Sequence, residues 1–355
     1  MRLISKILLV IFVTYFQTPA YSCSTFLLNG CEDKFMAKSY DWDQLHANVL
    51  INPRNLAKQS LVITPGDQPA QWISQYGSLT FNQHGRELPL GGINEAGLAI
   101  EIMWLDTSVY PAQDNRPVVN EAQWIQYQLD NFARVADVVA HADSLRVNPI
   151  VAQVHYLVCD KTGDCSTFEY IEGKLVIHHP LKINALTNST YDDSISFLRK
   201  HDGFGGLLPE PKGSSSLERF VRASNHSLDY GTCTFTPESV AYAFQGLTRV
   251  ASPTSIFNIV YEVGGGRAHF RTRLASQIKT VDLSEFDLSC KNPDNLRSLD
   301  MNTVTGGEVS AQFKPFTLKD NLALVQLGFE KFKDQVPAAL VPKLAAYPWQ
   351  FRCTE

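Results

Sequence analysis

The feature that constrains this chain most is its first cysteine, which follows directly on an export signal. Residues 1–22 carry two basic residues, an apolar stretch over 7–16 and small residues at the −3 and −1 positions of a cleavage site after Ser22. The sequence therefore predicts that residues 1–22 are a signal peptide. We expect residues 23–355 to fold as a single domain outside the cytoplasm, either periplasmic or secreted.

Cleavage after Ser22 would make Cys23 the first residue of the mature protein. Its thiol and a free α-amine would then belong to the same residue. An α-amine titrates near neutral pH, so it can serve as the base that activates the neighbouring nucleophile. The predicted processing site is thus also a candidate catalytic site.

The seven cysteines of the chain form an odd set, at positions 23, 31, 159, 165, 233, 290 and 353. In an exported protein the structural cysteines tend to pair, and an odd one is a reactive thiol or an intermolecular bridge. Cys23 is the cysteine that we expect to stay outside the disulfides. Cys159 and Cys165 flank a short turn between two expected strands and are the predicted local pair, whereas the other pairings stay open.

The composition argues against two classes of protein, nucleic-acid binders and membrane-spanning proteins. Loss of residues 1–22 would take two positive charges and no negative ones, so the formal net charge would change from −5 to −7. An acidic chain without basic runs is a poor nucleic-acid binder. The apolar stretch of the signal is too short to span a bilayer, and no later run is long enough, so no stable membrane insertion is expected after signal removal.

Hydrophobic patterning predicts an α+β protein, with strands in two main groups and helices between and after them. Apolar or alternating runs bounded by turn residues indicate strands, and Asn120 is a good N-cap for a first helix. Three glycines at 264–266 predict a hairpin turn. The expected strands are 24–28, 35–39, 49–52, 61–64, 98–105, 154–158, 166–171, 256–263 and 268–272, and the expected helices are 121–132, 135–145, 217–224, 237–250 and 318–332.

A hairpin of strands 24–28 and 35–39 would bring Asp41 back toward Cys23, where its carboxylate could hold the α-amine. An aspartate after a strand is, however, also a common turn residue. The hairpin alone does not decide between the two interpretations.

Five separated motifs, in order, resemble the choloylglycine hydrolase and penicillin V acylase group of N-terminal nucleophile hydrolases, also called linear amide C–N hydrolases. The resemblance covers nearly all of the mature chain. The motifs are Cys23-Ser24-Thr25-Phe26, Ala37-Lys38-Ser39-Tyr40-Asp41-Trp42, Gly92-Ile93-Asn94-Glu95-Ala96-Gly97-Leu98 running into Met103-Trp104, Leu186-Thr187-Asn188-Ser189, and Leu217-Glu218-Arg219-Phe220-Val221-Arg222.

The resemblance implies a four-layer αββα sandwich of two antiparallel sheets and an amidase that needs no cofactor or metal. It implies that Cys23 is the nucleophile, that Asp41 binds its α-amine and that Arg219 supplies positive charge. It also implies that Asn188 and the backbone N–H of Trp104 bind the oxyanion. The partner would be a small N-acyl amide, and the family further implies a homo-oligomer, a tetramer.

Two positions depart from the family pattern. Lys38 stands where the family commonly has arginine, and lysine keeps the charge but loses the planar fork. Trp104 stands where bile-salt hydrolases tend to have asparagine. With Trp42 it predicts a pocket wall for an apolar or aromatic acyl group. Penicillin V or N-acyl homoserine lactone substrates are therefore expected ahead of conjugated bile salts.

Other interpretations of the same residues remain open from sequence. Residues 20–23 form a loose lipobox, in which case Cys23 would be lipidated and the protein would be a membrane-anchored binding module. Asn188 begins a glycosylation sequon, which would place it in a surface loop. Arg219 could be a solvated helix charge, and Trp104 could simply be part of the core.

Overall fold

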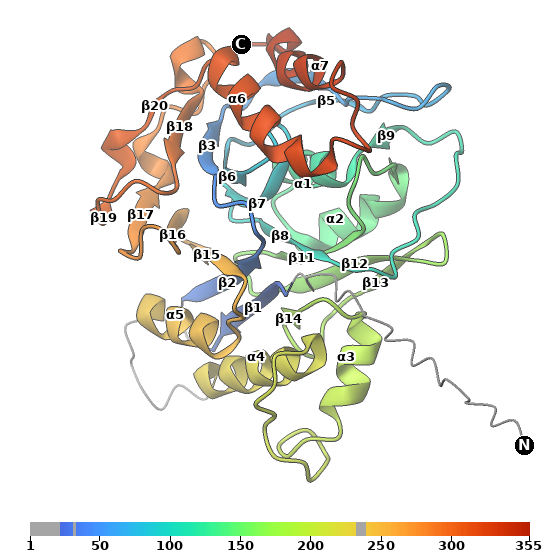
Figure 1. Cartoon of the computed structure of the whole chain (residues 1–355), viewed down its shortest axis with the longest axis vertical. Coiled ribbons are helices and arrows are strands. Elements are labelled where there is room, and N and C mark those ends of the chain that lie inside the picture. The colour runs from blue at the N-terminus through green and yellow to red at the C-terminus, as the bar shows by residue number, and fades with distance from the viewer. Residues whose placement is uncertain (1–21, 31–32, 232–238) are drawn as a thin grey trace, which may run out of the picture.

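A computed structural model describes residues 22–30, 33–231 and 239–355 of the chain. Two β-sheets lie face to face in the middle of the molecule, with helices on their outer faces (Figure 1). This is the four-layer αββα sandwich, so the predicted fold class is confirmed.

The first sheet has seven strands in the described residues and is antiparallel except for its last pair. Its centre joins the first two strands of the chain to a strand more than 200 residues further on, so distant segments meet beside the N-terminus. The strand order is β14 (Ala185–Leu186), β1 (Ser24–Asn29), β2 (Lys34–Asp41), β15 (Ser255–Glu262), β16 (Arg267–Thr272), β17 (Lys279–Asp282) and β19 (Gly307–Glu308).

The second sheet has nine antiparallel strands in the described part of the chain, and two small sheets flank it. The nine strands are β13 (Lys174–His178), β12 (Cys165–Ile171), β11 (Val154–Cys159), β8 (Ala99–Trp104), β7 (Pro89–Asn94), β6 (Ser78–Asn82), β3 (Asn48–Asn52), β18 (Arg297–Asp300) and β20 (Lys314–Pro315). The small sheets pair β21 (Arg352–Cys353) with β4 (Leu56–Gln59) and β5 (Gln71–Ile73), and β10 (Arg146–Val147) with β9 (Val118–Val119).

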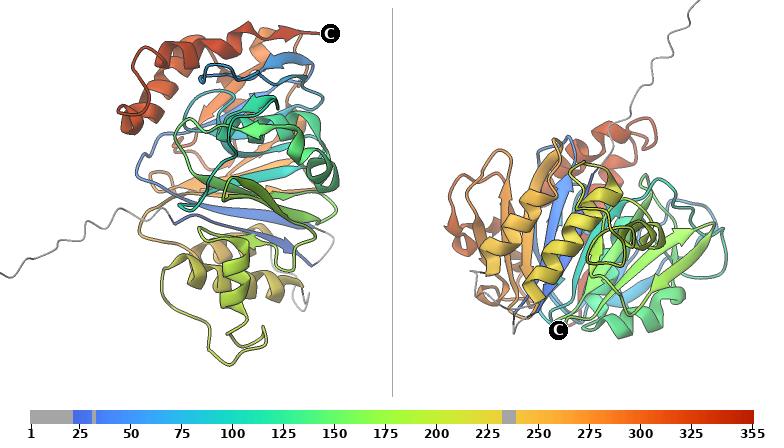
Figure 2. Two further views of the ribbon diagram at one scale, coloured as in Figure 1. Left: turned by 90° about the vertical axis from the view of Figure 1, so that its right-hand side faces the viewer. Right: turned by 90° about the horizontal axis from the view of Figure 1, so that it is seen from below.

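Helices cover both outer faces. Seen from below, α4 and α5 lie across β1 and β2 of the first sheet (Figure 2), and α1 packs on β7 and β8 of the second sheet. The C-terminal helices α6 and α7 pack on one another at the top of Figure 1. The helices are α1 (Glu121–Asn131), α2 (Val135–His141), α3 (Tyr191–Leu198), α4 (Ser216–Gly231), α5 (Ser239–Arg249), α6 (Leu318–Phe329) and α7 (Val341–Ala346).

Apolar side chains fill the space between the layers. The largest buried cluster lies between the two sheets and under α4 and α5, and a second cluster lies between the nine-stranded sheet and α1. Strands buried on both faces explain why apolar runs, rather than strict alternation, mark β1 and β11 in the sequence.

Most expected elements are present, including the hairpin of β15 and β16 around the three glycines. Asn120 caps α1 by accepting hydrogen bonds from the N–H groups of Ala122 and Gln123. The expected strand at 61–64 is wrong, because that segment is irregular and the strand precedes it as β4. The start of the expected helix 237–250 lies outside the described residues, which contain it as α5.

Two disulfides join described cysteines. Cys159 and Cys165 are bonded across the β11–β12 hairpin, so this predicted pair is confirmed. Cys290 is bonded to Cys353 and fastens the C-terminal strand β21. Cys31 and Cys233, for which no pairing was predicted, lie outside the described residues. Within those residues, no helix has the length and apolarity that crossing a bilayer requires.

Candidate active site

Cys23 lies immediately before β1, in the interior of the molecule. Its thiol is free and only 3% of the residue is exposed. The strand pairs Ser24 with Ser39 of β2, and this register continued by one residue sets Cys23 opposite Tyr40 and beside Asp41. Since side chains alternate along a strand, Cys23 shares its face with Thr25, whose hydroxyl contacts Met103 of the second sheet. The sulfur therefore points between the two sheets.

Asp41 is the last residue of β2 and is fully buried. Its carboxylate accepts hydrogen bonds from the hydroxyls of Ser39 at 3.0 Å and Ser252 at 2.5 Å. Burial raises the pKa of Asp41, and hydrogen bonds from Ser252 and Ser255 act against that rise. The hairpin thus brings a held carboxylate beside Cys23, as predicted, although its role toward the α-amine stays a prediction.

Arg219 enters the site from α4 and is 1% exposed, so it is not the solvated helix charge that was considered. Its guanidinium donates to the carbonyl of Cys23 at 2.6 Å, to the hydroxyl of Ser24 and to Asn188 Oδ1 at 2.8 Å. Burial lowers the pKa of Arg219 to about 10, which leaves the group charged at neutral pH. One cation therefore links α4, β1 and the loop that carries Asn188.

Asn188 follows β14 and turns its amide inward. Its Nδ2 donates to the carbonyl of Trp104 at 2.9 Å, while its Oδ1 accepts from Arg219. The hydrogen bond from Arg219 fixes which end of the amide is the acceptor, so the Nδ2 donors point toward Trp104. This inward position is not that of a sequon in a surface loop. The structure brings Trp104 to the same place, with its carbonyl bound to Asn188.

Lys38 is fully buried and reaches from β2 across to the second sheet. Its ammonium donates to the carbonyl of Ile102 and to Met103 Sδ, and lies 3.5 Å from the carboxylate of Glu101. Lys38 is not among the residues that line the cavity described below. It therefore acts on Cys23 through its charge, which lowers the thiol pKa, rather than by direct contact with a ligand.

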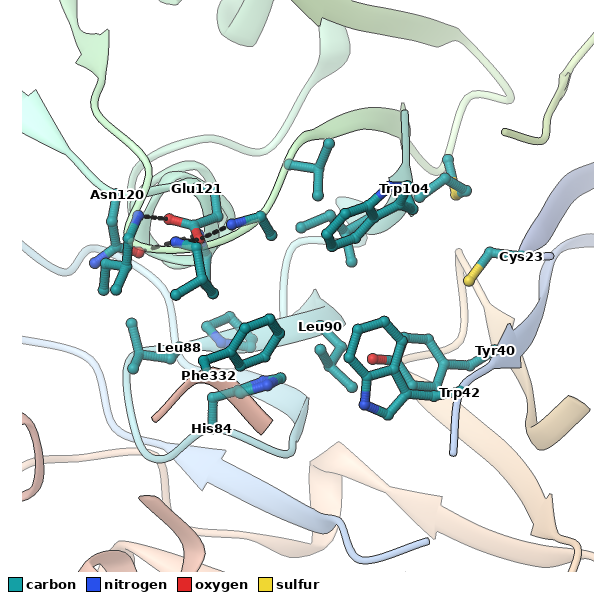
Figure 3. Close-up of a pocket in the computed structure, with 18 of the residues that line it drawn as sticks. Cys23, Tyr40, Trp42, His84, Leu88, Leu90, Trp104, Asn120, Glu121 and Phe332 are labelled. Atoms are coloured by element: carbon teal, nitrogen blue, oxygen red, sulfur yellow. Dashed lines mark hydrogen bonds between the residues drawn. The ribbon is translucent and has the colours of Figure 1, made fainter. Parts of the chain in front are cut away.

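An apolar cavity leads away from Cys23 (Figure 3). Trp42 and Trp104 line it near the cysteine, with ring centroids 6.1 Å apart, so the predicted aromatic wall is present. Asn120 and Glu121, at the start of α1, lie at its other end. The Glu121 carboxylate accepts three backbone N–H groups from residues 150–152, so it is already satisfied within the protein.

Burial and the neighbouring charges shift the pKa of the Cys23 thiol in opposite directions. Burial raises the pKa of the Cys23 thiol, and the charge of Asp41 adds to this, while the charges of Lys38 and Arg219 and the backbone N–H of Asp41 lower it. Burial is the largest of these effects. The thiol is therefore held protonated in this environment and needs a base before it can attack.

Several supporting residues were missed from sequence. Glu101 pairs with Lys38, and His155 bonds both the Glu169 carboxylate at 2.8 Å and the carbonyl of Thr187, next to Asn188, at 2.7 Å. Ser39 could have been found, because it lies two residues before Asp41 and so on the same strand face. His155 and Glu169 face each other across the predicted β11–β12 hairpin and could also have been found, whereas the Lys38–Glu101 pair joins strands of different sheets.

Comparison with known proteins agrees with this geometry. Residues 23–296 match the family described as linear amide C–N hydrolases, choloylglycine hydrolase family. The chain belongs to this family. It is 34% identical over 206 residues to a penicillin V acylase from Pectobacterium atrosepticum, a match that covers 53% of this chain and 54% of that protein. The chain thus spans about half the length of that curated relative.

Solved structures share the fold. The penicillin V acylase of Agrobacterium tumefaciens superposes with a TM-score of 0.74 at 27% identity, covering 83% of this chain and 98% of that one. A variant of the conjugated bile acid hydrolase of Clostridium perfringens superposes with a TM-score of 0.63 at 16% identity, covering 75% of this chain and 94% of its own. The second likeness concerns the fold alone.

Proposed function

We propose that this chain is the precursor of an exported amidase that hydrolyses the linear amide bond of N-acyl compounds, with Cys23 as its N-terminal nucleophile. The observation that carries the proposal is the free, buried thiol of Cys23 at one end of an apolar cavity, with Asp41, Asn188 and Arg219 around it. The family match supports it too, because it begins at Cys23.

The first half of the proposed reaction forms a thioester. Removal of residues 1–22 frees the α-amine of Cys23 beside Asp41, and this amine takes the proton of the thiol that burial would otherwise retain. The sulfur attacks the amide carbonyl, and the α-amine returns the proton to the leaving nitrogen as the C–N bond breaks. Asp41, whose carboxylate is held by the Ser252 hydroxyl, is the proposed partner that orients the amine.

The second half releases the acid. Water attacks the thioester carbonyl, the amine accepts its proton, and the C–S bond breaks to restore the thiol. In both halves negative charge develops on the carbonyl oxygen. An amide N–H of Asn188, which Arg219 orients, is the proposed donor to that charge, and the backbone N–H of Trp104 is the proposed second donor.

The cavity supports an apolar acyl group. Trp42, Trp104 and Phe332 offer ring faces along it, which favours aryl or alkyl acyl chains. We therefore rank phenoxyacetyl amides such as penicillin V, together with N-acyl homoserine lactones, ahead of conjugated bile salts. The relatives named penicillin V acylase support the first of these.

The alternative of a lipidated, membrane-anchored binding module receives no support. A lipid on Cys23 Sγ would have to leave the buried space between the two sheets. It would also leave Asp41, Asn188 and Arg219 without a shared purpose.

The test is activity of the mature protein on a panel of penicillin V, glycocholate, acyl homoserine lactones and N-acyl amino acids. Wild type should hydrolyse at least one of them, and Cys23→Ser should lose turnover while keeping its melting temperature. A second variant that retains one residue ahead of Cys23 keeps the thiol and blocks the amine, so it should be inactive as well. Wild-type activity in Cys23→Ser would refute the assignment.

A further inference from the structure

The wall of the acyl cavity farther from Cys23 is built in part by the C-terminal segment. Phe329 at the end of α6 and Phe332 in the short 3-10 helix Glu330–Phe332 both line the cavity. Residues 23–296 match the family, so this segment lies beyond the matched region. Part of the cavity wall therefore comes from outside the region that the family match covers.

Phe332 belongs to a row of aromatic rings that runs from Trp42 through Phe332 and His84 to Phe329. Its ring stacks on Trp42 with centroids 6.2 Å apart and lies 6.1 Å from the ring of His84. Phe329 meets His84 edge to face at 5.3 Å. Figure 3 shows Phe332 and His84 together between Trp42 and Leu88. The row thus continues the Trp42 surface away from the nucleophile.

Close packing fixes this segment to the body of the protein. A side chain at Gly328 would come within 2.4 Å of the carbonyl oxygen of Gln83, so only glycine allows α6 to lie against that turn. Asn321 accepts the backbone N–H of Arg86 at 2.7 Å, and Gln44 donates to the carbonyl of Leu327 at 3.0 Å. Phe332 therefore stands on a rigid support.

The row is uncharged at neutral pH. Burial lowers the pKa of His84 to about 4, so its imidazole is neutral and offers a ring face. The Lys331 ammonium, which lies 5.2 Å from the centroid of the Trp42 ring, is ion-paired with Asp43. An acyl group that reaches Phe332 thus meets mainly aromatic surface, which favours an uncharged group because a charged one would lose its hydration on burial.

We propose that Phe332, backed by His84 and Phe329, is a specificity-determining residue that selects uncharged aryl or alkyl acyl groups and limits their size. This inference rests on the proposed function. Phe332 is only partly buried and lies at the end of its helix, so it can be changed with less risk to the fold than Phe329, which is 4% exposed.

The experiment measures kcat and KM for amides of one amine with butanoyl, phenoxyacetyl and dodecanoyl groups. Phe332→Ala should raise KM for the phenoxyacetyl amide about 10-fold, the usual effect of losing a contact in an apolar pocket, with kcat little changed. It should also shift preference toward dodecanoyl, and Phe332→Trp should shift it the other way. The butanoyl amide serves as the small reference.

Leu327→Ala is the matched control, since Leu327 lies on α6 just before the short helix that carries Phe332 and is 48% exposed. Leu327→Ala should leave kcat and KM unchanged for all three amides. The proposal would be overturned if both Phe332 variants kept the wild-type ratios of kcat/KM among the three amides and had melting temperatures like that of wild type.

Binding separates this inference from the proposed function. In the Cys23→Ser background, phenoxyacetic acid should bind about 10-fold more weakly when Phe332 is alanine. If wild type hydrolyses no amide but this difference is found, the proposed function fails and the inference that Phe332 binds the acyl group is supported. If amides are hydrolysed and the two dissociation constants agree, the inference about Phe332 fails alone.

Discussion

At the scale of single residues, the site works through hydrogen bonds that fix orientation. Arg219 is the clearest case, because one buried guanidinium holds the carbonyl of Cys23, the hydroxyl of Ser24 and the amide of Asn188. Arginine suits this task because its donors are arranged in a rigid plane and stay charged when buried. The position of Asn188 therefore depends on a residue of α4, 31 positions further on.

Truncation of Asn188 tests the oxyanion assignment. Asn188→Ala should lower kcat about 10²–10³-fold with a smaller change in KM, since the lost donor acts mainly on charge that develops in the transition state. Asn184→Ala, just ahead of the same short strand, is the control and should keep near wild-type kcat. Equal kcat in wild type and Asn188→Ala would exclude this side chain from the oxyanion site.

Glu169 lies behind the Asn188 loop and gives a prediction for pH. Burial acts to raise its pKa, but hydrogen bonds from His155 and His178 outweigh burial and hold the pKa at about 2, below the ordinary 4.5. A depressed pKa means that the stabilisation is complete above pH 4.5 and is lost as pH falls from there toward 2.

Glu169→Gln should therefore lower the free energy of unfolding at pH 7 by about 3 kcal/mol and flatten its decline between pH 4.5 and 2. Urea unfolding at several pH values measures both effects. The exposed Glu285→Gln is the matched control. A Glu169→Gln variant whose stability falls with acid as steeply as that of wild type would contradict this account.

At the scale of elements, the sequence predicted most strands and helices, and its failures have physical causes. Residues 61–64 are apolar but do not pair as a strand, because the backbone N–H of Leu61 is bound instead by the side chain of Gln123. Helix α3 was missed because its eight residues are too few to show a clear helical period. Thr190 caps it by accepting the N–H of Asp193.

The residues of the candidate site also fall into those that the sequence predicted and those that it did not. Cys23, Asp41, Asn188, Trp104 and Arg219 were named from motifs, and the structure brings them together. The ion pair of Lys38 with Glu101 and the C-terminal aromatic wall were not predicted, because each joins segments more than 60 residues apart. No local pattern in the sequence records such pairings.

Lys38 and Glu101 connect the two sheets, since one lies on β2 and the other on β8. Lys38→Met would leave the buried Glu101 carboxylate without its cation, and should cost about 3–5 kcal/mol in the free energy of unfolding. Adding Glu101→Gln should recover part of that loss, because it removes the unpaired charge.

The exposed pair of Arg54 with Glu95 supplies the matched control. Arg54→Met should cost less than about 1 kcal/mol, the usual value of a surface ion pair. Similar losses from Lys38→Met and Arg54→Met in chemical denaturation would show that the inter-sheet pair contributes no more than a surface contact.

At the scale of the whole molecule, the chain closes on itself around the cavity. The N-terminal segment supplies Cys23, the middle of the chain supplies Asn188 and Arg219, and the C-terminal segment supplies Phe329 and Phe332 of the cavity wall. The disulfide of Cys290 with Cys353 closes a long loop that contains that wall. Assembly into a tetramer, implied by the family resemblance, stays a prediction for sedimentation analysis.

The two disulfides should contribute unequally to stability. The loop between Cys290 and Cys353 spans 63 residues, and that between Cys159 and Cys165 spans 6. Loop-closure entropy then predicts a loss of about 4 kcal/mol when the first pair is replaced by alanines and about 2 kcal/mol for the second. Urea unfolding without reductant measures both, and a larger loss from the short loop would contradict this estimate.

We propose that processing creates the catalyst by exposing the amine of Cys23 beside its own thiol. Mass spectrometry of the mature protein, quenched in acid during turnover of a slow N-acyl amide, tests this most directly. The expected result is an N-terminal peptide that begins at Cys23, is unmodified before reaction and carries the mass of one acyl group afterwards. A peptide that begins elsewhere, a lipid on Cys23, or an acyl group on another residue would contradict it.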